Sequence, residues 1–183
     1  MSENEKVDSG IGDTASNKKG SGARFNGGKP DYSLLDMRHV ALLNESVLSE
    51  SLKELGEYQF SGKLSTLENA YAFACKHAEM QFKARPVDVE KNADDHFMDT
   101  VTRVWEYGAQ KYEAWNWAAG MPWSVCIACI GRHFKKSMLQ DEYLDDESMQ
   151  PHWAHVLCNF QMLLLYQTQF PEGNDLPFNV IED

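Results

Sequence analysis

The stretch between Pro151 and Pro171 constrains the fold most, because apolar side chains occupy almost every side of the helix that it predicts. Proline suits the first turn of a helix and cannot continue one, so the two prolines mark where this helix begins and ends. A helix without a polar face must be covered by other elements. The sequence therefore predicts a central helix that forms the middle of the core.

Four further helices are predicted from apolar residues that recur with helical spacing. They cover about 36–55, 66–84, 99–112 and 124–138. Gly56 is typical of the residue that ends a helix, here the first of the four. Ser65 and Glu68 have the spacing of a capping box at the start of the second helix. Ser124 can cap the start of the fourth helix. The sequence contains no alternating strand pattern of useful length and no internal repeat. The predicted fold class is therefore all-α, with about five main helices.

Residues 1–23 have a composition that does not support a folded segment. After Met1, the only large aliphatic residues there are Val7 and Ile11, among many Ser, Gly, Asn and charged residues. Such a segment buries too little apolar surface to offset the entropy of ordering. We expect a disordered tail over 1–23, followed by a single all-α domain over 24–183.

The charge balance excludes several kinds of partner. Seventeen Lys and Arg against 28 Asp and Glu give a formal net charge of −11. Polymeric nucleic acids and anionic membranes both require a basic surface, so neither is an expected partner. Small anionic substrates remain compatible, because a bound divalent ion reverses the local charge. The hydrophilic N-terminus, the lack of a long apolar run and four cysteines expected to be reduced predict a cytoplasmic protein.

An acidic stretch follows the fourth predicted helix, where five of the seven residues at 141–147 are Asp or Glu. If this stretch is helical, Glu142 and Asp145 share a face, and Glu147 lies close by. One interpretation is a solvated, acidic helix end or loop. The other is a Mg²⁺ or Mn²⁺ site, because these cations prefer carboxylate oxygens and leave positions open for phosphates.

His152, His155 and Asn159 are spaced so that all three lie on one face of the last helix. Burying three polar groups on an otherwise apolar helix is costly unless each finds a partner. This spacing indicates a functional face. Its side chains would contact a phosphate or a base, or would orient the nearby carboxylates.

Two further clusters could contact a substrate. Arg132 and His133, with two lysines after them, form a positive cluster that either complements the end of a helix or holds phosphate oxygens. In the aromatic stretch 112–123, Trp117 would either fill the core or stack on a base. Lys111 and Asn116 lie beside it, as candidates for contacts with a phosphate and with the edge of a base.

Zinc chemistry is a weaker alternative. Cys126 and Cys129 precede His133 on one helix face, as zinc ligands sometimes do, but buried cysteines often act as small apolar residues. Zinc-dependent nucleotide deaminases use H-x-E and P-C-x-x-C, and this chain has His77 and Glu79 before those cysteines. On a helix, however, His77 and Glu79 point to different sides.

Together these motifs resemble a known family. The stretches are RFNGGKPDYSLL at 24–35, YGAQKYEAWNWAAG at 107–120, RHFKK at 132–136, DEYLDDES at 141–148 and HWAHVLCNFQMLL at 152–164. In this order they resemble the bacteriophage dATP/dGTP diphosphohydrolase family, which is MazZ-like and related to the all-α MazG-type nucleoside triphosphate pyrophosphohydrolases. The resemblance implies hydrolysis of dGTP or dATP to the monophosphate and pyrophosphate, a MazG-like helical bundle, and an enzyme that acts in the host cytoplasm and forms a homo-oligomer.

The resemblance also suggests site residues, to which we assign roles from their chemistry. The metal ligands for Mg²⁺ or Mn²⁺ would be Glu142, Asp145 and Glu147, and the catalytic residues would be His152 and His155. Substrate would contact Lys29, Lys111, Asn116, Trp117, Arg132, His133 and Asn159. An acid on an earlier helix would complete the metal site, with Glu45, Glu50, Glu54, Glu57 and Glu106 as candidates.

The chain departs from the family pattern in two respects. Asp141 and Met149 stand where the pattern usually has glycine, and residues 38–99 match nothing in it, so we expect a diverged or inserted helical segment around 56–98. The main alternative function is a phage protein that binds a nucleotide or a host factor without catalysis. The zinc deaminase is a weaker alternative.

Overall fold

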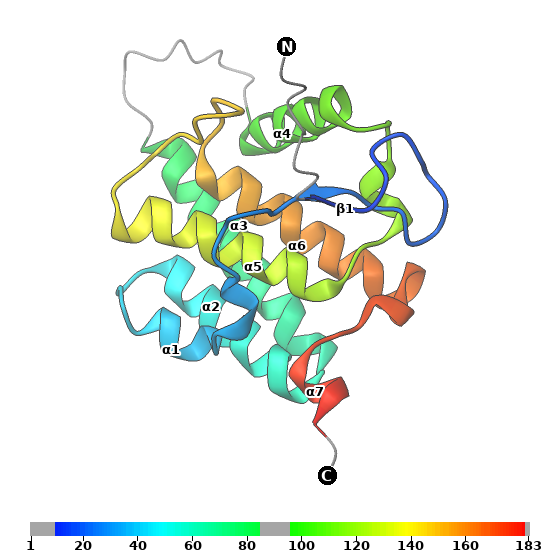
Figure 1. Ribbon diagram of the computed structural model, residues 1–183. Helices are drawn as coiled ribbons and strands as arrows, with labels where there is room; N and C mark the ends of the chain where they lie inside the picture. Colours follow the sequence, from blue (N-terminus) through cyan, green and yellow to red (C-terminus); the bar gives the residue numbers. More distant parts are fainter. Residues whose placement is uncertain (1–9, 85–95, 182–183) are drawn as a thin grey trace.

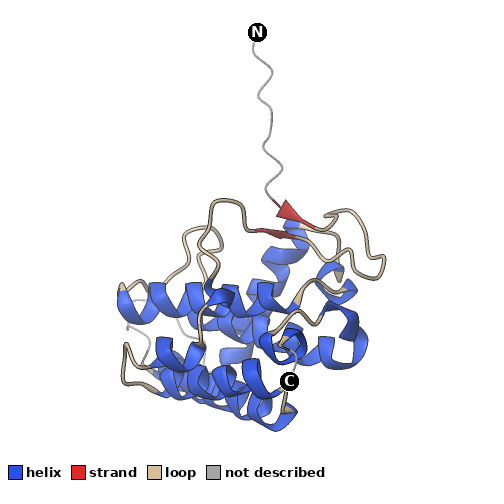
Figure 2. Ribbon diagram, turned by 60° about the horizontal axis from the view of Figure 1, so that its bottom comes forward, coloured by secondary structure: helices blue, strands red, loops and turns tan. Residues whose placement is uncertain are grey.

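The computed structural model describes residues 10–84 and 96–181. Its helices are α1 Met37–Ala41, α2 Val47–Ser61, α3 Leu64–Lys83, α4 Phe97–Lys111, α5 Trp123–Phe134, α6 His152–Gln169 and α7 Pro177–Val180, with short helical turns η1 Tyr32–Leu34, η2 Asn116–Ala119, η3 Lys135–Leu139 and η4 Pro171–Gly173. Two-residue strands, β1 Gly10–Ile11 and β2 Arg24–Phe25, form the antiparallel pair that Figure 2 draws at the edge of the helical body. The all-α prediction with five main helices is confirmed.

Helix α6 is the centre of the core, as its sequence predicts. It packs against α3, α4 and α5, and Leu157, Phe160 and Leu163 in its middle are fully buried. Figure 1 shows α4 across the top of the molecule and α1 with α2 at the lower left. This arrangement covers the apolar helix on several sides and leaves its first turns beside the loop before Pro151.

The single helix predicted over 36–55 is wrong, because two helices occupy this stretch. Helix α1 ends at Ala41 and α2 begins at Val47, where the Ser46 side chain accepts a hydrogen bond from the Ser49 amide. Gly56 does not end a helix. It lies inside α2, and a side chain there would meet the Arg38 backbone nitrogen at 2.5 Å, so the glycine allows α1 and α2 to pack closely.

Two predicted caps are also wrong. Helix α3 begins at Leu64, with no side-chain cap from Ser65. Helix α5 begins at Trp123, and Ser124 instead bonds Asp175 through its backbone amide at 2.8 Å. The predicted end near residue 138 agrees with the π-helical turn η3, which continues α5.

Residues 10–23 correct the prediction of a disordered tail, whereas residues 1–9 lie outside the described residues. The segment follows a defined path, and its Gly20 and Gly22 amides donate to the carbonyls of Ala119 and Gly120 at 2.6 and 2.9 Å. The composition of this segment does not reveal its order, because the hydrogen-bond partners of its amides are polar groups about 100 positions away in the chain. The segment buries little apolar surface of its own.

The segment expected around 56–98 to be diverged or inserted is helical where it is described. Helix α3 contributes Leu67, Ala70 and Ala74 to the main core. It packs on both α2 and α6. Within the described residues, no helix is both long and apolar enough to cross a membrane.

Candidate active site

A cavity of about 420 Å³ lies between α4, α5, α6 and the segment that begins with β2. This volume is within the range of small-molecule sites. Ten of the twelve residues predicted for the site line it, namely Lys29, Lys111, Asn116, Trp117, Arg132, His133, Asp145, Glu147, His155 and Asn159. The other two, Glu142 and His152, contact each other through His152 Nε2 at 3.3 Å.

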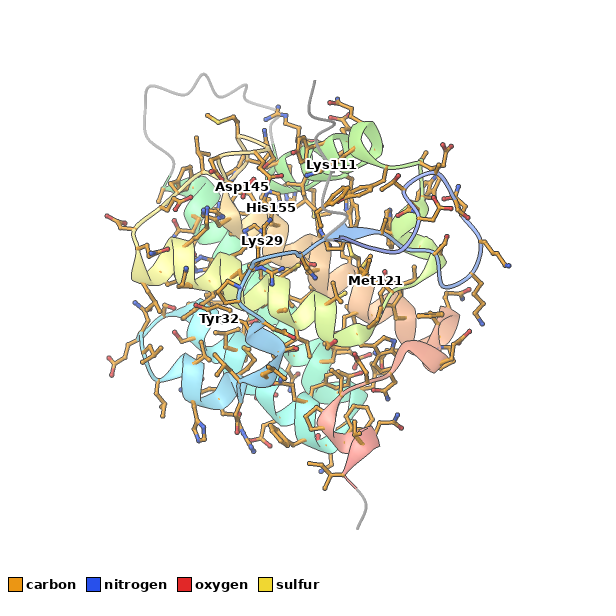
Figure 3. The ribbon with its side chains drawn as sticks, viewed as in Figure 1. Lys29, Tyr32, Lys111, Met121, Asp145 and His155 are labelled. Carbon is orange, nitrogen blue, oxygen red and sulfur yellow. The ribbon has the colours of Figure 1, made fainter. Side chains whose placement is uncertain are left out.

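The two ends of the cavity differ in chemistry. One end is lined by the apolar and aromatic side chains of Val104, Trp105, Trp117, Met121 and Met162, and the ring centroids of the two tryptophans are 4.4 Å apart. The other end carries charged side chains. Figure 3 shows Lys29, Lys111, Asp145 and His155 close together there, with Met121 apart from them. The cavity therefore offers an apolar slot and an ionic end to one ligand.

Helix α6 presents its polar residues to the site on successive turns, as the spacing predicts. His155 Nε2 lies 2.7 Å from the Ser148 hydroxyl oxygen. Asn159 donates through Nδ2 to the His155 carbonyl oxygen at 2.8 Å and accepts through Oδ1 from Arg24 at 2.9 Å. Each of the polar groups on this face has a partner, which makes their burial tolerable.

The acidic stretch forms a loop rather than the helix considered from sequence. Leu144 bridges to Pro151, and Asp145 Oδ1 accepts hydrogen bonds from the Ser148 amide and hydroxyl at 3.0 and 3.1 Å. Asp141 and Met149 at the two ends of this loop have φ values of 54° and 56°. This left-handed region favours glycine, which agrees with the glycine that the resemblance leads one to expect at these two positions.

The three predicted carboxylate ligands do not come together. Glu142 Oε1 bonds Lys136 Nζ at 2.8 Å, and Glu147 Oε2 bonds Lys111 Nζ at 2.8 Å. These hydrogen bonds to lysines hold the pKa values of both glutamates below their usual range. Lys29 Nζ adds a second cation, 3.7 Å from Glu147. Glu142 and Glu147 are thus each neutralised by lysine.

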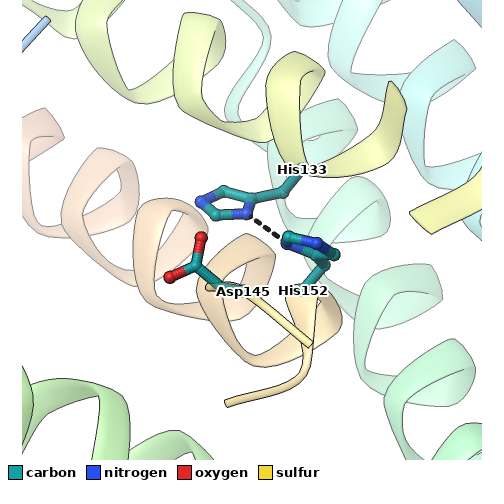
Figure 4. A group of neighbouring side chains, drawn as sticks. All are labelled: His133, Asp145 and His152. Carbon is teal, nitrogen blue, oxygen red and sulfur yellow. Dashed lines mark hydrogen bonds between the residues drawn. The ribbon is translucent and has the colours of Figure 1, made fainter. Parts of the chain in front are cut away.

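A different group does come together, and Figure 4 shows its members, His133, Asp145 and His152. One potential ligand atom from each lies within 4.8 Å of the others. The two histidines approach through their Nδ1 atoms at 2.9 Å, and His155 stacks on His133 with ring centroids 4.5 Å apart. The sequence analysis assigns His133 to substrate binding and not to a metal site. The contact between α5 and α6 that brings His133 to His152 cannot be seen in either motif alone.

The protonation states of this group suit metal binding. Burial, reinforced by the neighbouring imidazoles, lowers the pKa of His133 well below its ordinary value, and burial also lowers the pKa of His152. Burial raises the pKa of Asp145, but the nearby His155 and the Ser148 hydrogen bonds outweigh it, so the net shift is downward. Two neutral imidazoles and one carboxylate are the forms that bind a cation.

Asn116 holds the N-terminal segment and has no free amide group directed at a ligand. Its Oδ1 accepts from the Ala23 amide at 2.8 Å, and its Nδ2 donates to the carbonyls of Asp13 and Ser16 at 2.8 and 2.7 Å. The side chain is 1% exposed. Its role in substrate binding would therefore be indirect.

Asn116→Ala is expected to release this segment and to destabilise the protein by about 1–3 kcal/mol, because it leaves the buried Ala23 amide without an acceptor. Trypsin should then cleave faster after Lys18 and Lys19. Limited proteolysis and urea unfolding measure the two effects. Asn179→Ala, at an exposed position in α7, is the control. Unchanged cleavage in Asn116→Ala would contradict this role.

Arg132 is also occupied by protein groups. It donates to the Pro30 carbonyl at 3.2 Å and to Asn26 Oδ1 at 2.9 Å, so it supports the loop that carries Lys29. Arg24, which also lines the cavity, was not selected from the sequence. Arg24 opens the first stretch that carries the family resemblance, but it is a single arginine at the border of a segment expected to be disordered, and the sequence alone assigned it no role.

The residues of the zinc alternatives lie apart. His77 is buried in α3, and Glu79 forms an ion pair with Lys83 on the same helix. Among the described residues, neither joins Cys126 or Cys129 in a group able to hold a metal. The candidate acids of earlier helices, Glu45, Glu50, Glu54, Glu57 and Glu106, do not line the cavity either.

One family model matches this chain. The model is described as dATP/dGTP diphosphohydrolase, N-terminal, and it matches residues 76–176, more than half of the sequence. The matched stretch runs from α3 through α6 and includes the histidine cluster, the acidic loop and most of the cavity wall. No curated protein and no solved structure matches the chain.

Proposed function

This chain belongs to the dATP/dGTP diphosphohydrolase family, and from that premise we propose that its cavity binds a purine deoxynucleoside triphosphate and hydrolyses it to the monophosphate and pyrophosphate. The observation that carries the proposal is a cavity with an aromatic slot at one end and lysines beside a His–Asp–His group at the other. A base fits the first end and phosphates fit the second.

The residues at the ionic end fit a divalent transition ion. His133, Asp145 and His152 would hold it, and a donor set with two imidazoles favours Mn²⁺ over Mg²⁺, which prefers oxygen ligands alone. Glu142, 3.3 Å from His152 Nε2, would fix the orientation of this imidazole, as carboxylates often do behind a metal-bound histidine. A bound ion would supply a Lewis acid for the phosphate oxygens.

The lysines would bind the phosphates by exchanging one anion for another. Lys111 and Lys29 both contact Glu147, and all three side chains are between 33% and 48% exposed. An ion pair this accessible contributes little to stability, so both lysines can turn toward an incoming triphosphate. Charge-assisted hydrogen bonds to phosphate would replace those to Glu147.

His155 is the better candidate for the proton acceptor, since it lines the cavity and His152 does not. Burial lowers its pKa to about 4, which keeps the imidazole neutral and able to accept a hydrogen bond from the attacking water. The negative charge of a bound triphosphate would raise this pKa again. Ser148, 2.7 Å from Nε2, would hold the ring in place.

Incubation of the purified protein with dGTP or dATP and Mn²⁺ is expected to release the deoxynucleoside monophosphate and pyrophosphate, which ion-exchange chromatography resolves. The control contains EDTA. If no nucleotide is consumed by folded, metal-loaded protein, the hydrolase proposal is wrong and the non-catalytic binding function takes its place. Release of ammonia with the triphosphate intact would instead indicate a deaminase. The phage origin, host-cytoplasmic location and homo-oligomeric state remain predictions, and light scattering tests the last of them.

A further inference from the structure

Arg24 is held firmly at the wall of the cavity. Its backbone pairs with Ile11 in the two-stranded sheet, and the preceding amide, that of Ala23, donates to Asn116 at 2.8 Å. Its side chain lines the same cavity as the residues of the aromatic slot. The anchoring on both sides places one guanidinium at a defined position beside any bound ligand.

The guanidinium of Arg24 has incomplete partners. Its Nη2 donates to Asn159 Oδ1 at 2.9 Å and to the Met162 sulfur at 3.4 Å. Its Nε is buried and has no hydrogen-bond partner. No carboxylate in the described chain lies within ion-pair distance of it. A buried donor without an acceptor is costly, and so is a cation without a counter-charge, so this group is prepared for an acceptor on a ligand.

The surroundings of Arg24 suit a base better than a phosphate. Its contacts on α6 are Asn159 and Met162, two to three turns after His152, which is about 10–15 Å along the helix axis. The other side chains near its guanidinium include Cys126, Cys129, Tyr112 and Tyr166, which are apolar or aromatic. The positive charge of Arg24 also acts on His133 and His155, so Arg24 is not remote from the ionic end. Its hydrogen bonds nevertheless go to the neutral groups of Asn159 and Met162, whereas Lys29 and Lys111 contact the carboxylate of Glu147.

We propose that Arg24 binds the O6 and N7 edge of a guanine base, so that the site prefers dGTP to dATP; this inference rests on the proposed binding of a purine nucleotide in the cavity. Guanine presents two acceptors on this edge, which match the paired donors of a guanidinium. Adenine presents an amino group at C6, which would face the guanidinium donor to donor. Asn116 and Asn159 act as positioning residues for Arg24.

Binding of reaction products tests the inference without requiring turnover. The wild-type full chain is titrated with dGMP, dIMP and dAMP and followed by calorimetry. Because dIMP shares O6 and N7 with dGMP, both should bind roughly 10- to 100-fold more tightly than dAMP. Arg24→Met should reduce dGMP affinity to that of dAMP while changing dAMP affinity less than about threefold. Arg103→Met, an exposed arginine on α4, is the matched control and should change neither.

Several outcomes would overturn the inference. The first is equal affinity of the wild type for dGMP and dAMP. The second is an equal loss of affinity for dGMP and dAMP in Arg24→Met, which would assign Arg24 to phosphate binding or to stability of the fold. If Arg24→Met does not fold, Arg24→Lys keeps the charge but not the paired donors and should still lose the preference. Hydrolysis of dNTPs without a guanine preference refutes only this inference. A guanine preference without hydrolysis refutes only the proposed reaction.

Discussion

Asp145→Asn is expected to lower kcat/KM for the purine triphosphate by at least about 100-fold and to weaken Mn²⁺ binding, because it removes the one carboxylate from the His133, Asp145 and His152 group. The fold should survive. Asparagine keeps an oxygen that can accept the hydrogen bonds from Ser148, so the loop can retain its conformation. Steady-state kinetics over a range of Mn²⁺ concentrations and calorimetric Mn²⁺ titration measure the two effects.

Asp141→Asn is the matched control for this change. Asp141 begins the same loop, is exposed, and has a left-handed φ of 54°, which asparagine tolerates. Its kcat/KM and Mn²⁺ affinity should equal those of the wild type. If Asp145→Asn also keeps wild-type activity within about threefold, the ion is not held by Asp145, and the proposed metal site is wrong.

Acidification is expected to destabilise the protein, with His77 responsible for part of the loss. Burial in α3 lowers the pKa of His77 from 6.5 to about 4. The folded state therefore keeps this imidazole neutral, whereas the unfolded chain takes up a proton below pH 6.5. The stabilisation from this group is present above pH 6.5 and is lost as the pH falls toward 4, by up to about 3 kcal/mol.

His77→Leu replaces the imidazole with a side chain that does not titrate. The free energy of unfolding, measured in urea at pH 7.5 and pH 4.5, should then change by about 2–3 kcal/mol less than in the wild type. His39→Gln is the control, because His39 is exposed and is solvated in both states. An equal pH dependence in wild type and His77→Leu would show that His77 is not the group that takes up the proton.

The helices were predictable because helical periodicity is local. Leu157, Phe160 and Leu163 lie within two turns of one helix, and their spacing alone indicates burial. The break between α1 and α2 was missed because the apolar spacing of Val40, Leu43 and Val47 continues through it. A short-range contact, from Ser46 to the Ser49 amide, begins a new helix there instead.

The composition of the site was predictable in large part, but the partners within it were not. The motifs selected most of the cavity lining, since residue types that carry charge or stack on a base stand out in sequence. Two of the selected residues, Asn116 and Arg132, hold the N-terminal segment and its loop. Their partners lie about 100 residues away, and no local pattern records a contact of that length.

The sequence by itself determined that this chain forms helices around one apolar helix, and which residue types face the cavity. The tertiary structure decided which of them meet. In the folded protein, His133 of α5 contacts His152 of α6, and Asp145 is the one of five nearby acids that lies beside them. Arg24, at the edge of a polar N-terminal segment, lines the cavity. The physical reason is that periodicity depends on neighbours within a turn or two. The meeting of side chains depends on how helices pack and how the loop after η3 folds back.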